Sequence, residues 1–247
     1  MKFKGGKKIY GACLGILMLE ANFPRIPGDV GNAKTWPFPV QYRVVQGATP
    51  ERVVLNRAKD LLLPFINSAK ELVNSGADGI TTNCGFLSLF QKEISEAVNV
   101  PVVTSSLMQV SLVNEILPPN KYAGIITISA KTLSADHLNK ANVPINTPIV
   151  GTDEEGEFSQ VVLKNKYELD YNLAKQDVLN ASNELVKNNK QIGAIVLECT
   201  NMVPFAADIR KSIGLPVFSI YNFILWFQNS LIPNRFEINL DDPRIQV

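Results

Sequence analysis

Apolar runs alternate along the chain with stretches whose apolar positions recur at helical spacing. In the first half, the runs that predict β-strands cover residues 15–19, 40–45, 79–82 and 100–103. Residues 61–74 and 87–98 have apolar side chains every three or four positions, which is typical of helices that cover a sheet. We expect Gly76 to end the first of these helices. Strands separated by helices in this way predict an α/β fold with parallel strands.

The second half of the chain repeats this order. Its predicted strands are residues 122–129, 148–150, 193–197 and 215–218, and its predicted helices are residues 167–187 and 203–213. The halves also share a spacing, since Cys84 lies 17 residues before Pro101 and Cys199 lies 17 residues before Pro216. This register favours a duplicated α/β unit over a coincidence between two ordinary strand–helix–strand segments.

The duplication predicts two α/β domains, each with a mostly parallel four-stranded sheet flanked by helices. The second domain is predicted over residues 118–220. The first is predicted over residues 1–117 together with 221–247, because the aromatic-rich helix expected at 221–231 should pack back onto the first half.

The N-terminal segment allows two interpretations. Residues 1–8 carry four lysines and are followed by an apolar run over residues 9–19, which is the pattern of a secretory signal peptide. The run has a counterpart in mid-chain, which favours a basic lead-in to a buried first strand. No other segment is long enough to span a membrane. We therefore expect a cytoplasmic protein, a location that suits free thiols.

Composition narrows the possible functions. The 247 residues are 46% hydrophobic and 19% charged, which is typical of a globular protein. The net charge of +1 gives no basic excess that would indicate nucleic-acid binding. Three cysteines without a Cys-x-x-Cys pair argue against a disulfide framework or a structural zinc site. The single histidine, His137, has polar neighbours and is expected on the solvated surface, which disfavours a histidine-based metal site or catalytic triad.

Two of the cysteines stand where parallel sheets bind ligands. Cys84 and Cys199 each follow a predicted strand and precede a predicted helix, at the carboxyl end of the sheet. A helix N-terminus at this point is expected to lower a thiol pKa from about 8.5 toward neutrality. If the halves face each other about a pseudo-two-fold axis, one thiolate removes a proton from a stereocentre while the opposite thiol delivers one to the other face.

The alternative is that these cysteines are structural, since free cysteine is often buried. Their polar neighbours Asn83, Thr200 and Asn201 instead favour a site that holds a carboxylate or carbonyl group. Cys13 has no such neighbours and precedes the first strand, so we interpret it as structural.

The segments around both cysteines resemble the aspartate/glutamate/hydantoin racemase superfamily. The resemblance covers nearly the whole chain and is carried by the duplication and by residues 82–86, 197–202 and 15–20. It implies two pseudo-symmetric Rossmann-like domains, no cofactor or metal, and an active site in the cleft between the domains. Cys84 and Cys199 would be the catalytic pair. The resemblance is also compatible with a homodimer.

The resemblance extends to some flanking residues and fails at others. Thr200 matches the threonine after the second family cysteine, and Glu20 falls where glutamate racemases have an aspartate, so Glu20 would assist a thiol or bind an ammonium group. Gly85-Phe86 replaces the usual Asn-Thr, and Asn201 stands where glutamate racemases have histidine. Because both departures affect substrate-holding positions, neither glutamate nor aspartate is assigned as substrate.

A loop rich in proline and glycine, residues 22–39, leaves the carboxyl end of the first predicted strand. Prolines stiffen such a loop and glycines allow tight turns, so we expect it to cover the cleft. Arg25 within it would either clamp a substrate carboxylate in bidentate fashion or pair with Asp29 as a staple of the loop.

These features predict a cofactor-independent racemase or epimerase of an amino acid or related carboxylate, with a small carboxylate as its partner and neither nucleic acid nor membrane. The predicted substrate-binding residues are Asn83, Gly85, Thr200, Asn201, Arg25 and Glu20. One alternative is a maleate-isomerase-like or decarboxylase-like enzyme of the same superfamily, of which the two cysteines disfavour the decarboxylase. Another is a non-catalytic small-molecule binding protein, which would need the N-terminal segment to be a cleaved signal.

Overall fold

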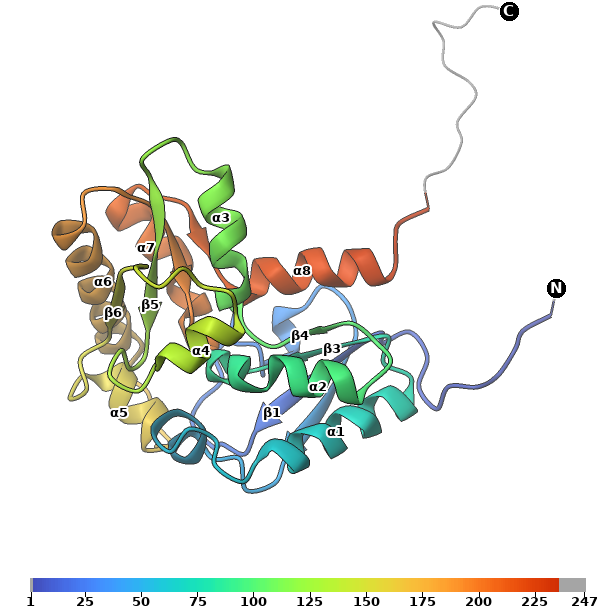
Figure 1. Ribbon diagram of the computed structural model, residues 1–247. Coiled ribbons are helices and arrows are strands. Elements are labelled where there is room, and N and C mark those ends of the chain that lie inside the picture. The colour runs from blue at the N-terminus through green and yellow to red at the C-terminus, as the bar shows by residue number, and fades with distance from the viewer. Residues whose placement is uncertain (1, 236–247) are drawn as a thin grey trace, which may run out of the picture.

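The computed structural model describes residues 2–235, which form two parallel four-stranded sheets with helices around them (Figure 1). The first sheet has the order β2-β1-β3-β4, and the second has the order β6-β5-β7-β8. The strands are β1 (Leu14–Leu19), β2 (Val40–Val45), β3 (Gly79–Thr82), β4 (Val102–Val103), β5 (Tyr122–Thr127), β6 (Ile149–Gly151), β7 (Ile192–Leu197) and β8 (Val217–Phe218). Because each half visits its sheet in the same order, the predicted duplicated α/β fold is confirmed.

Eight α-helices are found among the described residues. They are α1 (Leu62–Ser75), α2 (Gln91–Ala97), α3 (Val110–Ile116), α4 (Ala135–Lys140), α5 (Glu157–Leu163), α6 (Tyr171–Asn188), α7 (Ala206–Ile213) and α8 (Ile220–Leu231). As predicted, α1 ends at Gly76, whose left-handed φ of 119° lets its N–H reach back to the carbonyls of Leu72 and Val73.

The helices predicted after each cysteine begin differently from the prediction. Residues Gly85–Phe90 and Thr200–Phe205 form short 3-10 helices, and only then do α2 and α7 begin. Further short helical turns cover Ala33–Thr35, Glu51–Leu55 and Ser106–Gln109. The apolar periodicity was the same for both kinds of helix, so it could not distinguish the tighter turns.

The predicted first strand is confirmed as a central strand of its sheet. All six residues of β1 are buried, and β1 pairs in parallel with β2 on one side and with β3 on the other. In the second sheet β5 has the same place between β6 and β7. The two central strands end at equivalent edges, and the cysteine segments are attached to those edges.

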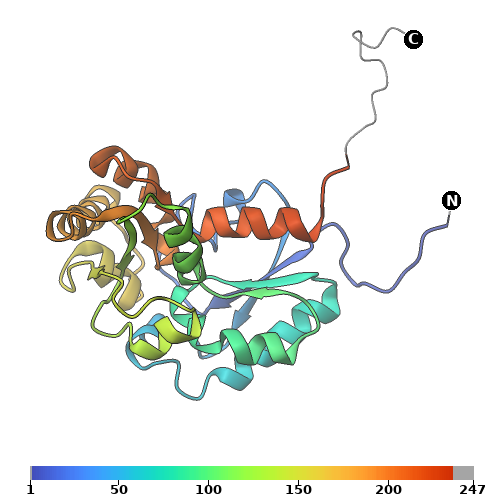
Figure 2. The same ribbon diagram turned by 45° about the horizontal axis from the view of Figure 1, so that its top comes forward.

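The last helix returns from the second half of the chain to the first. In both views α8 runs from the second sheet across the first (Figures 1 and 2). Ile220, Ile224 and Phe227 of α8 pack in one apolar cluster with Leu14 and Ile16 of β1. The domain boundaries expected at 117/118 and 220/221 stay predictions, and residues 236–247 of the first predicted domain lie outside the described residues.

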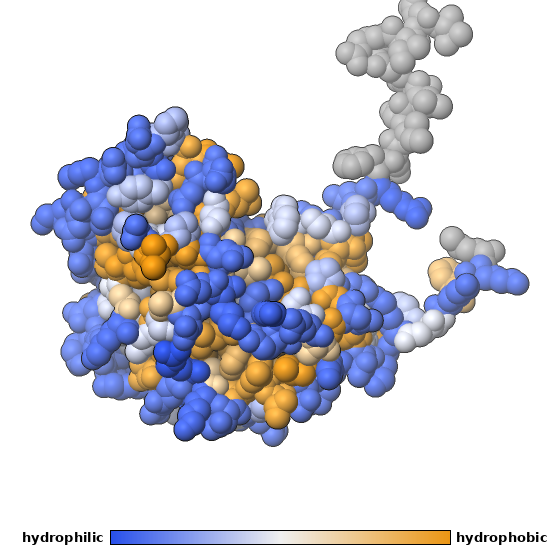
Figure 3. Space-filling view, viewed as in Figure 1, coloured by the Kyte–Doolittle hydropathy of each residue, from blue (hydrophilic) through white to orange (hydrophobic). Residues whose placement is uncertain are grey.

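The surface of the molecule mixes residue types over both halves. In Figure 3 hydrophilic residues dominate the visible face, with hydrophobic residues showing between them. Exposed apolar side chains include Leu112 and Ile116 on α3 and Trp226 on α8. Within residues 2–235, no helix combines the length and apolar character needed to cross a membrane.

Candidate active site

The two cysteines lie at equivalent ends of the two sheets. Asn83, which precedes Cys84, donates its backbone N–H to the carbonyl of Leu17 in β1 at 3.0 Å. Glu198, which precedes Cys199, donates its backbone N–H to the carbonyl of Ile126 in β5 at 2.8 Å. Each cysteine segment is therefore held by the central strand of its own sheet, as expected for a duplicated unit.

The structure brings both thiols into one small cavity between the halves. Its polar lining is Arg25, Asn83, Cys84, Glu198, Cys199, Thr200 and Asn201, and its remaining lining includes Gly85, Leu19, Phe23, Val54, Phe86, Ile128 and Val162. The cavity volume of about 20 Å³ has room for roughly one water molecule. This volume is smaller than an organic substrate. Among the described residues, no cluster of His, Cys, Asp and Glu side chains is arranged to hold a metal ion.

The residue after each cysteine contacts the residue before the other one. The Thr200 hydroxyl donates a hydrogen bond of 2.6 Å to the carbonyl of Asn83. In the reverse direction, a Cβ atom placed on Gly85 would overlap the backbone oxygen and Oε1 of Glu198. A side chain at position 85 would therefore have to displace Glu198, and the two cysteine segments interlock across the boundary between the halves.

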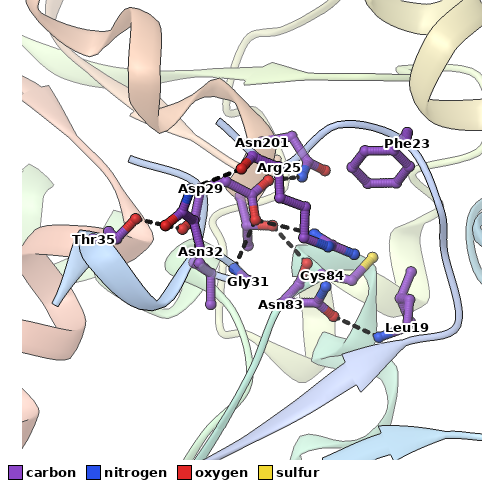
Figure 4. Close-up of polar contacts among 12 residues, drawn as sticks. Leu19, Phe23, Arg25, Asp29, Gly31, Asn32, Thr35, Asn83, Cys84 and Asn201 are labelled. Atoms are coloured by element: carbon purple, nitrogen blue, oxygen red, sulfur yellow. Dashed lines mark hydrogen bonds and ion pairs between the residues drawn. The ribbon is translucent and has the colours of Figure 1, made fainter. Parts of the chain in front are cut away.

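Asn83 connects the first cysteine segment to the end of β1 by a side-chain hydrogen bond. Its side-chain Oδ1 accepts the backbone N–H of Leu19 at 2.8 Å, at the end of β1 (Figure 4). The neighbouring Thr82 hydroxyl donates to the carbonyl of Thr104 at 2.7 Å. These bonds fix the position of the Cys84 backbone beside the cavity.

The structure shows one of the two arrangements expected of Arg25, the pair with Asp29, and the carboxylate clamp stays a prediction. Its Nη1 pairs with Asp29 Oδ1 at 3.0 Å, as the loop staple requires (Figure 4). Its Nη2 is buried and has no hydrogen-bond partner among the described residues. The guanidinium carbon lies 4.6 Å from the centre of the Phe23 ring, and both side chains line the cavity. One guanidinium nitrogen therefore remains for a ligand.

The loop of residues 22–39 is attached to the second half of the chain on both sides of Arg25. The backbone N–H groups of Asn22 and Phe23 donate to Asn165 Oδ1 at 2.6 and 3.2 Å. Further along the loop, Asp29 accepts a hydrogen bond from the side-chain amide of Asn201 (Figure 4). The loop thus covers the cavity and ties the two halves together.

The structure does not bring Glu20 together with the cysteines. Its side chain is exposed, and its carboxylate accepts the backbone N–H of Gly47 at 2.8 Å beside a different, open hollow. The reason is the alternation of side chains along an extended chain: Leu19 faces the cavity, so the next residue faces away. Cys13 is buried at the other end of β1, where Gln228 lies 3.8 Å from its sulfur.

The expectation of thiols with lowered pKa values is wrong. Burial raises the pKa of both Cys84 and Cys199, and the nearby charge of Glu198 raises both further. The turns that follow the cysteines are short 3-10 helices, whose small dipoles do not offset this loss of solvation.

The two thiols nevertheless differ in their surroundings. The backbone N–H groups of Phe86 and Leu87 and the charge of Arg25 favour the Cys84 thiolate and so lower its pKa in part. Cys199 has one such backbone group, from Asn201, while the charge of Asp29 raises its pKa. The Cys199 thiol also donates to Asn201 Oδ1 at 3.6 Å. Cys84 is therefore the better thiolate and Cys199 the better thiol.

Glu198 is a functional candidate that the sequence interpretation passed over. It is fully buried, and burial raises its pKa to about 8, although the Thr127 hydroxyl donates to its Oε2 at 2.7 Å and acts in the opposite direction. Its Oε1 has no hydrogen-bond partner in the described part of the chain. The available signal was its position, since a charged residue directly follows the apolar strand β7 and directly precedes a cysteine.

The prediction that His137 is a solvated surface residue is also wrong. His137 is fully buried, and its ring packs edge-on against Phe86, with the ring centres 5.0 Å apart. Its Nδ1 accepts the backbone N–H of Ser134 in a capping box at the start of α4. Burial lowers the pKa of His137 to about 4, so the ring is neutral near pH 7. Its polar sequence neighbours reflect a helix start rather than an exposed site.

The chain was compared with protein families and with known sequences. No family model matches the chain. Its sequence is similar to that of a dimethylsulfoniopropionate lyase from Durusdinium sp. clade D, with 27% identity over 237 residues, covering 92% of this chain and 78% of the relative. It is also similar to dimethylsulfoniopropionate lyase 7 of Emiliania huxleyi (strain CCMP1516), with 28% identity over 240 residues, covering 92% of this chain and 69% of the relative.

Solved structures with the same fold include a decarboxylase and two racemases by name. An arylmalonate decarboxylase is 15% identical with a TM-score of 0.59, over 92% of this chain and 95% of its own. A glutamate racemase isoform from Bacillus anthracis is 17% identical with a TM-score of 0.58, over 90% and 85%. The aspartate racemase of Picrophilus torridus is 12% identical with a TM-score of 0.54, over 91% and 96%.

These solved structures show that the chain has the same two-sheet fold as arylmalonate decarboxylase, glutamate racemase and aspartate racemase. The sequence relatives and the structural neighbours are all enzymes, which supports an enzyme rather than a binding module. Their names give different reactions: a lyase, a decarboxylase and racemases.

Proposed function

We propose that this protein is a cofactor-independent lyase that removes the proton next to a substrate carboxylate and expels a sulfonium leaving group from the β carbon. Its substrate would be dimethylsulfoniopropionate or a close analogue. The observation that carries this proposal is the composition of the cavity lining. Arg25, whose buried Nη2 has no hydrogen-bond partner among the described residues, lines the same cavity as three acids, Cys84, Cys199 and Glu198, and several apolar side chains.

This lining suits a substrate with one carboxylate and one cation that lacks N–H groups. Arg25 Nη2 can donate to the carboxylate as a charge-assisted hydrogen bond. A dimethylsulfonium group needs no hydrogen-bond acceptors and is attracted to aromatic rings, which Phe23 and Phe86 provide. An amino-acid ammonium group would need several acceptors. In the lining, Asn83 Oδ1 already accepts from Leu19 and Asn201 Oδ1 from the Cys199 thiol, which leaves Glu198 Oε1 as the free carboxylate or amide oxygen among the described residues.

In the proposed reaction, the Cys84 thiolate accepts the α proton. The electrons of the broken C–H bond form the carbon–carbon double bond, and the bond between the β carbon and sulfur breaks. The products are acrylate and neutral dimethyl sulfide, with one proton released to solvent. The substrate cation has a second effect, because a positive charge in the cavity offsets the burial that raises the Cys84 pKa.

Racemisation, with Cys84 and Cys199 as base and acid, is the second candidate. The specific observation that favours it is that the thiols line one cavity from opposite halves of the chain. The sequence relatives, which cover 92% of this chain, favour elimination instead. In both candidates the partner is a small carboxylate, and a homodimer stays a prediction.

The deciding experiment supplies purified protein with dimethylsulfoniopropionate and measures dimethyl sulfide in the headspace and acrylate in solution. Equal amounts of both products are expected, with loss of activity in Cys84→Ser. The matched control is Cys13→Ala, which alters a buried cysteine outside the cavity and should keep the activity. Exchange of α-hydrogen for deuterium in amino acids, without any dimethyl sulfide, would instead establish the racemase.

A further inference from the structure

Glu198 lines the same cavity as both thiols. It directly precedes Cys199, and its Oε1 lies against Gly85, the residue that directly follows Cys84. This oxygen is buried and has no hydrogen-bond partner among the described residues, whereas Oε2 is occupied by the Thr127 hydroxyl. One carboxyl oxygen is therefore held in place by a hydrogen bond, and the other has no hydrogen-bond partner among the described residues.

The cavity limits how many of its acids can be ionised together. The titratable or charged groups that line it are Cys84, Cys199, Glu198 and Arg25, and Asp29 already neutralises much of the Arg25 charge. Two neighbouring anions in so small a space would repel each other strongly. Burial and Glu198 raise both thiol pKa values, while that of Glu198 rises only to about 8. The first proton to leave the free site therefore leaves Glu198.

We propose that Glu198 is the internal proton acceptor of the site, which takes the thiol proton of Cys84 when the sulfonium group of the substrate enters the cavity. This inference rests on the proposed function for the identity of the substrate. The S–H bond of Cys84 breaks and an O–H bond forms on Glu198, so the negative charge moves to sulfur. The thiolate then accepts the α proton of the substrate. When the products leave, Glu198 releases its extra proton to solvent and the starting state is restored.

In this proposal Glu198 exchanges a proton with Cys84 and does not react with the substrate itself. It acts through Cys84, so its removal should change the pH at which the enzyme works more than the affinity for substrate. Glu198→Gln keeps the shape of the side chain and cannot ionise. Glu198→Asp keeps the acid and provides a second variant if the glutamine protein does not fold. Glu71→Gln, which alters an exposed carboxylate paired with Arg43, is the matched control.

A titration without substrate tests the order of ionisation independently of turnover. Infrared difference spectra follow the protonated carboxyl group, and ultraviolet absorbance follows thiolate. In the wild type and Glu71→Gln, a carboxyl band should vanish through about pH 8, before thiolate absorbance appears. The band should be absent in Glu198→Gln, and its thiolate absorbance should appear at lower pH because the neighbouring charge is gone. Thiolate that forms first in the wild type would overturn the inference.

The pH profile of kcat/KM for dimethylsulfoniopropionate completes the test. The wild-type profile should rise through about pH 8 as Glu198 ionises. Glu198→Gln should lose this rise, be about 10²-fold slower at neutral pH, and recover only where the thiol ionises by itself. An unchanged profile in an active Glu198→Gln would refute the role of Glu198 alone. Absence of turnover in the wild type would refute the proposed function, while the titration would still decide the order of ionisation.

Discussion

The two cysteine segments hold equivalent places in their sheets and carry different side chains. Asn83 and Glu198 occupy equivalent positions, because each donates its N–H to the central strand of its own sheet. Asn83 uses its side chain to bind the end of β1, whereas Glu198 carries a buried acid with one unoccupied oxygen. Gly85 and Thr200 are likewise equivalent, yet one is a glycine and the other donates a hydrogen bond across the boundary.

The two halves therefore share the placement of their thiols and differ in the environments around them. Backbone N–H groups and Arg25 stabilise charge on Cys84, and Asn201 Oδ1 accepts a hydrogen bond from the Cys199 thiol. A symmetric pair would suit racemisation, in which the two thiols exchange roles. An asymmetric pair suits a reaction that moves a proton in one direction, such as elimination.

The largest expected effect comes from replacing each thiol separately. Cys84→Ser should lower kcat for elimination by about 10³-fold, because it removes the base. Cys199→Ser should lower it only about tenfold, as expected for one altered hydrogen bond. Steady-state kinetics with dimethylsulfoniopropionate measure both. Equal losses of kcat in the two variants would contradict the proposed difference between the thiols and would favour a racemase, in which both thiols act as acid and base.

The pH dependence of stability isolates the acid that only the second segment carries. The pKa of Glu198 is raised from 4.5 to about 8 on folding, so the folded state keeps a proton that the unfolded state has lost between these values. Wild-type stability should therefore fall as pH rises through this window, and Glu198→Gln should escape the fall. The difference in unfolding free energy, from urea denaturation of both proteins, should change by a few kcal/mol in favour of the variant. Taking this difference cancels the opposite contribution of His137, whose pKa is lowered to about 4. Parallel curves would contradict the assignment.

Arg25 is expected to bind the substrate carboxylate and to stabilise the Cys84 thiolate rather than the Cys199 thiolate. Arg25→Lys keeps the charge but not the second N–H group, so KM should rise about 10- to 100-fold, which corresponds to one charge-assisted hydrogen bond. Arg43→Lys, an exposed change, is the control. An unchanged KM would mean that the guanidinium only staples the loop.

Gly85→Ala tests the contact between the first segment and Glu198. The added methyl group would overlap Glu198, so the protein should lose about 1–3 kcal/mol of unfolding free energy. Gly5→Ala is the control, because nothing lies near the position of its added methyl group. Thermal and urea denaturation measure the loss, and wild-type stability in Gly85→Ala would show that the segments are not interlocked.

The smallest effect is expected on the opposite contact. Thr200→Val keeps the shape of the side chain and removes the hydrogen bond to the Asn83 carbonyl, which should cost about 1 kcal/mol. The same denaturation experiments measure it. A loss much larger than that of Gly85→Ala would reverse the order of the two contacts.

Much of this architecture could be predicted from the sequence because it depends on local patterns. The apolar run at β1, the helix end at Gly76 and the register of Cys84 with Cys199 all follow from spacing. The thiol pKa values could not be predicted in this way, since desolvation depends on the side chains that close the cavity. Glu198 was missed because glutamate is rarely buried without a partner, and His137 because its buried contact with Phe86 is distant in sequence. Glu20 was expected in the site, but side chains alternate along the extended chain, so Leu19 faces the cavity and Glu20 faces away from it.

The return of α8 to the first sheet has a consequence for how the chain is made. Protein synthesis proceeds from the N-terminus, so β1 leaves the ribosome some two hundred residues before the helix that covers Leu14 and Ile16. Until Ile220, Ile224 and Phe227 follow, one apolar face of the first sheet has no cover from this helix. The second half can therefore complete its sheet first, and the half that is synthesised first is the last to close.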